Sequence, residues 1–433
     1  MVEQAIYYIN IVWDIIKNWW WVLLPLILYR PFVFFWLWWR FEDWMFQQKI
    51  VLLEIKMPKE VLRPVRAMEQ TFDAIWGNLF DQPDWWEKWV EGKRQIGMEL
   101  EMVSLEGEPH LYIRTNQSRK DAIEASIYSQ YPDAEIIVAN DYTTNIPSSL
   151  PNKDWEIWGT DYMLLKKDVY PIKTYSKFFE ERPEIAKEEK RIDPLATLFE
   201  GMAKMKKDEQ LWIQISAEPI SINEDDFVKR GRAEADLLAK RPPSSKGKSI
   251  FKEAAEILIL GKVEENKKED LKLEQLLPPE SRLTPGEKDV VAAVEQKVSK
   301  HCFKCYIRFI YLAKREAYFG AAKSIPLGFF QQFATENLNN LVPFSRTITK
   351  IHRYPILDFV RARRNFMRKR RLFFRYIKRM SPLFPKPGGT FLLNVEEVTT
   401  LFHFPGRAVS QAPSMSRVES KKGEAPPGLP MEE

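Results

Sequence analysis

The chain has 433 residues, of which 45% are apolar and 13% aromatic, so it can bury ordinary protein cores and is not a disordered polypeptide. Its formal net charge of +5 is small for this length, which excludes a global electrostatic attraction to nucleic acid and leaves that role to local basic segments. The cysteines, Cys302 and Cys305, are too few for a disulfide framework, and the four histidines do not add up to a metal site. We interpret both thiols as structural groups of a half-buried strand.

The most apolar stretch runs from Asn18 to Trp39, "NWWWVLLPLILYRPFVFFWLWW", and carries one charge in 22 residues. As a helix that rises 1.5 Å per residue, it would cover the hydrocarbon layer of a bilayer, which is about 30 Å thick. Tryptophans crowd both of its ends, as in the aromatic belts of membrane proteins: Trp19, Trp20, Trp21, Trp36, Trp38 and Trp39. We therefore predict a transmembrane helix within a membrane anchor that comprises residues 1–48.

Arg30 and Pro31 lie near the middle of this predicted span, where an arginine costs roughly 2.5–3.5 kcal/mol. Three alternatives fit: a kinked span in which the arginine snorkels, an arginine that pairs with a partner helix, and an interfacial or re-entrant segment that breaks at the proline. We favour the kinked span. More basic residues follow the span than precede it, which predicts a single pass with the bulk of the chain in the cytoplasm.

After the predicted anchor, the hydrophobic period changes repeatedly between two and 3.6, which indicates an α+β fold. Residues 49–140 predict the order β-α-β-β-α-β of a ferredoxin-like unit, and "GMELEMVSL" within it predicts a strand whose glutamates face water. Residues 141–335 repeat this order more loosely around a polar insertion at 221–286. We predict two ferredoxin-like α+β units that arose by internal duplication.

The segment "PPSSKGKS" contains Gly247, Lys248 and Ser249, the end of a phosphate-binding loop. That loop needs a glycine five positions before the second one, and Pro242 stands there instead. A charged helical stretch also precedes the segment, where the motif requires a strand. We interpret the segment as a linker, predict no cofactor, metal or catalytic residue, and expect the protein not to be an enzyme.

The sharpest local feature is "FVRARRNFMRKRRLFFRYIKRM", which lies within a helical segment predicted at 336–385. Its apolar residues recur every seven positions, which predicts a basic amphipathic helix. We rank three roles for it: contact with anionic lipid, contact with nucleic-acid phosphates, and a solvated charged face. The ten basic residues, with no acidic residue among them, are Arg361, Arg363, Arg364, Arg368, Lys369, Arg370, Arg371, Arg375, Lys378 and Arg379.

Several segments spread along the chain carry a resemblance to a known family. They are "VLLEIKMPKEVLRPVRAMEQTFDAIWG", "IEASIYSQYPDAEI", "PNKDWEIWGTDY", "RIDPLATLFEGMAK" and "NVEEVTTLFHFPG" with "ESKKGEAPPGLP". The chain resembles the N-terminal region of bacterial membrane-anchored proteins that are related to type IV secretion and conjugation ATPases of the HerA and FtsK class, and otherwise a domain of unknown function. In that family, a tail such as the one at 386–433 looks like the approach to the ATPase domain.

No complete phosphate-binding loop occurs in the sequence. The resemblance therefore implies one of two proteins: a split version whose ATPase is a separate chain, or a paralogue that keeps only the anchoring and docking parts. We expect a non-enzymatic, membrane-anchored scaffold or recruitment subunit for a type IV secretion or conjugative DNA-transfer ATPase. The alternative is a membrane-tethered nucleic-acid-binding protein that acts through the basic helix. The expected location is the bacterial inner membrane, and the expected partners are lipid, a HerA- or FtsK-like ATPase, DNA and a second copy. Residues predicted to dock a partner are Phe402, His403, Phe404 and Pro405.

Overall fold

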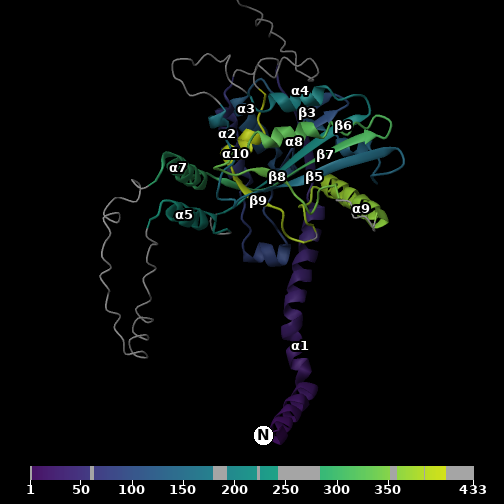
Figure 1. The fold of residues 1–433 in the computed structure, drawn as a ribbon, viewed down its shortest axis with the longest axis vertical. Helices are drawn as coiled ribbons and strands as arrows, with labels where there is room; N and C mark the ends of the chain where they lie inside the picture. The colour runs from purple at the N-terminus through teal and green to yellow at the C-terminus, as the bar shows by residue number, and fades with distance from the viewer. Residues whose placement is uncertain are drawn as a thin grey trace, which may run out of the picture.

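The computed structural model describes residues 2–58, 63–178, 193–221, 225–241, 283–351, 358–384 and 386–405 (Figure 1). The strands are β1 (Ile50–Lys56), β2 (Met98–Leu105), β3 (Glu108–Asn116), β4 (Glu135–Ala139), β5 (Trp155–Leu164), β6 (Glu209–Pro219), β7 (Cys302–Lys314), β8 (Leu341–Pro343) and β9 (Phe391–Asn394). The α-helices are α1 (Val2–Gln47), α2 (Val65–Leu79), α3 (Lys120–Gln130), α4 (Ala196–Ala203), α5 (Phe227–Leu238), α7 (Pro285–Ser299), α8 (Ser324–Gln331), α9 (Asp358–Ile377) and α10 (Val395–Leu401). Short helical turns are η1 (Glu87–Glu91), η2 (Gln117–Arg119), η3 (Tyr142–Asn145) and η4 (Tyr175–Lys177). The segment "PPSSKGKS" lies outside the described residues.

The strands form one large antiparallel sheet, so the fold is α+β. The first half has the strand order β4-β1-β3-β2, and the second half has the equivalent order β8-β5-β7-β6. Helices α5 and α7 lie in the connection between β6 and β7; α5 falls within the predicted insertion at 221–286, and α7 begins at the end of that insertion. Strand β2 pairs with β6 from Met98↔Ala217 to Leu105↔Gln210. The two halves therefore share a continuous sheet instead of forming separate bodies.

Helices cover both faces of this sheet. On one face, helices α2, α3, α4, α8 and α10 pack over the larger core, and Figure 1 shows them in the upper part of the molecule, away from α1. On the other face, α9 and the η3 turn cover a smaller core that includes Tyr142, Trp212 and Tyr376. Strand "GMELEMVSL" was predicted to face water with its glutamates. That prediction is wrong, because α9 covers this side and leaves Glu101 fully buried.

Helix α1 has 46 residues and is continuous through Pro25 and Pro31. It runs away from the sheet as a long rod (Figure 1). Among the described residues, no helix combines the length and the apolar character that crossing a membrane requires. The predicted transmembrane helix from Asn18 to Trp39 is therefore wrong. The prediction relied on tryptophans, whose indole N–H makes them amphipathic, in a stretch that also contains Arg30 and the two prolines.

The C-terminal part of α1 contacts the η1 turn. The indole Nε1 of Trp36 donates a hydrogen bond to the carbonyl oxygen of Trp89 at 2.8 Å, and Arg40 donates to the carbonyl of Val90. Gly92 follows the turn with φ +76°, and a Cβ there would lie 2.2 Å from the Arg40 carbonyl oxygen, so this close approach requires glycine. Among the other predicted anchor residues, the side chains of Trp19 and Trp20 are outside the described part. The remaining five are all exposed: Trp21, Arg30, Pro31, Trp38 and Trp39.

Candidate nucleic-acid interface

The basic segment forms helix α9, and its inner side packs on the sheet. Leu372, Phe373 and Tyr376 are buried there, against a core that includes Trp212 and Ile310. These three positions follow the spacing of one helical face. The seven-residue repeat seen in the sequence thus serves partly for packing within the protein.

Two arginines at the C-terminal end of the segment are paired inside the protein. The Nε of Arg379 lies 3.0 Å from Glu101 Oε1, and its Nη1 lies 2.7 Å from Asp141 Oδ2. Arg375 Nη2 lies 3.7 Å from Oδ2 of the buried Asp161, which in turn pairs with Arg308 at 3.0 Å. Burial alone would raise the pKa of Asp141, but the hydrogen bonds and charge of Arg379 hold it below its usual range. These arginines stabilise the position of α9 and are not available to a partner.

Two more basic residues contact the protein at the side of the helix. Lys369 Nζ lies 2.6 Å from Glu156 Oε1, and Arg368 donates to the carbonyl oxygen of Ile348 at 3.0 Å. Arg361 is half-buried. The ten charges are therefore partly compensated by carboxylates and carbonyls that lie far away in the sequence.

The outer side of α9 keeps a basic surface. Five predicted residues are exposed and have no acidic partner among the residues that the structure describes: Arg363, Arg364, Arg370, Arg371 and Lys378. They recur at a spacing of seven positions, about two helical turns, which places them along one side of the helix. Exposed apolar side chains lie between them: Phe366 is 44% exposed, Met367 38% and Phe374 50%. We call these eight residues the outer α9 face.

A family model describes most of this architecture. It matches residues 100–417, which include the sheet from β2 onward, α9 and the β9–α10 segment. The chain belongs to the DUF8128 family, a domain of unknown function. Among curated proteins, none matches the sequence. The DUF8128 match confirms the broader part of the resemblance, a domain of unknown function.

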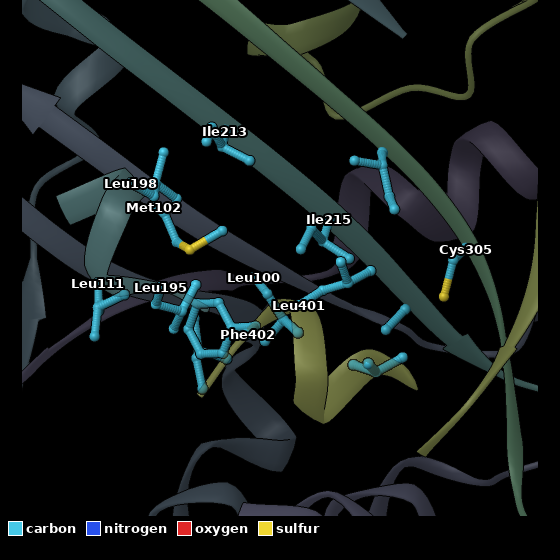
Figure 2. Close-up of a cluster of buried hydrophobic side chains, with 14 of the residues drawn as sticks. Leu100, Met102, Leu111, Leu195, Leu198, Ile213, Ile215, Cys305, Leu401 and Phe402 are labelled. Atoms are coloured by element: carbon cyan, nitrogen blue, oxygen red, sulfur yellow. The ribbon is translucent and has the colours of Figure 1, made fainter. Parts of the chain in front are cut away.

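The four residues predicted to dock a partner are part of the DUF8128 core. Phe402 and His403 are fully buried, Phe404 is 3% exposed and Pro405 is buried. Figure 2 shows Leu401 and Phe402 among Leu100, Met102 and Leu111. The apolar run "LFHFP" therefore fills the core and offers no docking surface in the folded state.

An acidic pair beneath α9 was not recognised in the sequence as part of this site. Glu101 accepts hydrogen bonds from Tyr142 at 2.8 Å and from Gln214 at 2.7 Å, in addition to Arg379. Burial, together with the charge of Glu101, raises the pKa of Glu99 to about 7. The available signal was charge complementarity: a strand with two glutamates matches the stretch 361–379, which has arginines and no acidic residue.

Proposed function

We propose that the chain is a non-enzymatic recruitment protein that binds nucleic acid through the outer α9 face. The observation that supports this proposal is the set of five exposed basic residues without acidic partners in the described structure. Neutralising phosphates with such residues releases condensed counterions, which drives binding at low salt. Helix α9 is held rigidly on the sheet by its buried side chains and ion pairs, so little conformational entropy is lost when it binds.

The geometry favours nucleic acid over a lipid surface. A helix that lies on a bilayer inserts its apolar side among the acyl chains. In α9, that side is already packed on the sheet through Leu372, Phe373 and Tyr376. The outer face instead offers separate rings, Phe366 and Phe374, between arginines, and single-stranded nucleic acid uses rings for base stacking and cations for its phosphates.

Reversing two charges on the outer α9 face is expected to weaken binding about ten- to hundredfold at 0.1 M salt. The variant is R370E/R371E, and fluorescence anisotropy with a labelled single-stranded DNA measures its affinity over a salt series. The slope of log affinity against log salt should fall by about 1.4 when two phosphate contacts are lost. The matched control, K288E/K304E, makes the same net charge change at exposed positions on α7 and β7, and it should bind like the wild type.

Binding that does not depend on salt, or that is equally weak in both double variants, would reject the outer α9 face as the site. Anionic vesicles provide the second arm of the experiment. Co-sedimentation with vesicles that R370E/R371E abolishes, with no DNA binding by the wild type, would assign the face to lipid instead.

We further propose that the recruited partner is a separate ATPase of the HerA or FtsK class, as the resemblance implies. One observation supports this: residues 394–405, which carry part of the resemblance, form the end of β9, helix α10 and buried core positions. The resemblance therefore extends into the folded body. This proposal is independent of nucleic-acid binding.

Deleting residues 407–433 is expected to abolish co-purification of such an ATPase from native cells while DNA binding and folding persist. The deletion keeps Leu401, Phe402 and the rest of the described core. A cut before residue 401 would remove buried side chains, and loss of a partner would then reflect unfolding. Mass spectrometry of a tagged pull-down gives the readout, and unchanged ATPase recovery would reject a role for the tail.

A further inference from the structure

Strand β4 forms one edge of the sheet, and in the described chain it pairs only with β1. The opposite edge, β8, has three residues and ends in Pro343. Natural edge strands are usually protected by lysine, proline, a bulge or very short length. Strand β4 has the sequence "EIIVA", with none of these residues and one charge, and its Val138 is 60% exposed.

We propose that β4 pairs antiparallel with β4 of a second copy of this chain, about a two-fold axis at Ile137. In this register, Ile137 faces Ile137 of the second copy, and Ile136 faces Val138 of the second copy. Glu135 faces Ala139 of the second copy, so no like charges oppose each other within β4. Beyond the strand, Asp133 faces Asp141 of the second copy, and the charge of Asp141 is compensated by Arg379 within its own chain. Opposed apolar side chains stabilise such pairs, and a self-complementary patch is what a two-fold dimer requires.

Other registers are less favourable. A pairing centred on Val138 leaves Glu135 and Ile136 outside the paired part of β4, and one centred on Glu135 opposes two glutamates. Like charges that face each other directly across strands are destabilising. A pairing centred on Ile136 leaves Val138 and Ala139 outside the paired part of β4. The register centred on Ile137 is the one that pairs all five residues of the strand without such repulsion.

Cysteine cross-linking tests this register. In I137C, the two new thiols face each other across the axis, where opposed Cβ atoms are about 4.5–5.5 Å apart, close enough for a disulfide after small adjustments. The matched control is E135C, whose two thiols are offset by four residues, or about 13 Å along the strand. The native Cys302 and Cys305 do not interfere, because both are buried and burial raises the pKa of Cys302 to about 12.

Mild oxidation is expected to convert I137C to a covalent dimer on a non-reducing gel and to leave E135C and the wild type monomeric. Equal cross-linking of both variants would indicate random collision and would overturn the proposal, as would no cross-linking of I137C. Light scattering over a concentration series gives an independent readout. The wild type should show a dimer and V138K a monomer, since a lysine is a common edge-strand guard; a dimer that survives V138K, or a monomeric wild type, would also overturn the proposal.

Discussion

Replacement of Arg379 by methionine is expected to lower the free energy of unfolding by about 3–5 kcal/mol. The Arg379 side chain is 3% exposed, its guanidinium pairs with Glu101 and Asp141, and the Glu101 side chain is fully buried. Methionine retains much of the packing volume but removes the only cation paired with Glu101 among the described residues. A buried charge that loses its partner costs several kcal/mol, because it has neither water nor an opposite charge around it.

Urea denaturation followed by tryptophan fluorescence measures this change. The matched control is K378M, one residue earlier, which is exposed and should change stability by less than about 0.5 kcal/mol. Adding E101Q to R379M should recover part of the loss, since the unpaired charge is then gone. Equal stability of R379M and K378M would show that the pairing does not fix the end of α9 to the sheet.

The variant F402A is expected to lose about 3–5 kcal/mol of stability, because truncating a fully buried phenylalanine leaves a cavity. The Phe402 ring packs edge-on against Phe72 of α2, with centroids 6.3 Å apart. Thermal and urea unfolding provide the measurement. The control F374A makes the same truncation on the outer α9 face, where the side chain is 50% exposed, and should have little effect.

The variants F402A and F374A also test whether the "LFHFP" run belongs to the core or docks a partner. If F402A remained as stable as the wild type and yet failed to capture a partner, the "LFHFP" run would be a binding surface and the buried placement would be contradicted. F374A should instead weaken DNA binding, because it removes a ring from between the arginines.

Features encoded within short windows of the sequence were predictable. The alternation in β2 and the seven-residue repeat in α9 predicted a strand and a helix where the structure has them. Partners far apart in the sequence were not predictable from periodicity. Pairing of β2 with β6, and of Glu101 with Arg379, depends on how the two halves meet, so the glutamates were wrongly placed in water and the arginines were counted as uncompensated.

Composition misled the prediction where one residue type suits two environments. Tryptophan marks membrane interfaces, but its ring also packs on protein and its N–H binds backbone carbonyls, as Trp36 does with Trp89. The same ambiguity applies to the apolar run at Phe402, which reads equally well as a docking motif and as core. The exposed basic residues of α9 could be separated from the buried or paired ones only after the structure showed which side of the helix packs on the sheet.

The position of β9 and α10 has a consequence for synthesis of the chain. Strand β9 pairs with the beginning of β7, and α10 leads to Phe402, which packs on α2 from the other end of the described sequence. Contacts between such distant segments slow folding, because a long loop must close before they form. Until this segment has been synthesised, the core shown in Figure 2 lacks Leu401 and Phe402, although Leu195 and Leu198 are already present. The nascent protein therefore exposes part of this apolar core until β9 and α10 have been synthesised, and such exposed apolar surface favours aggregation during folding.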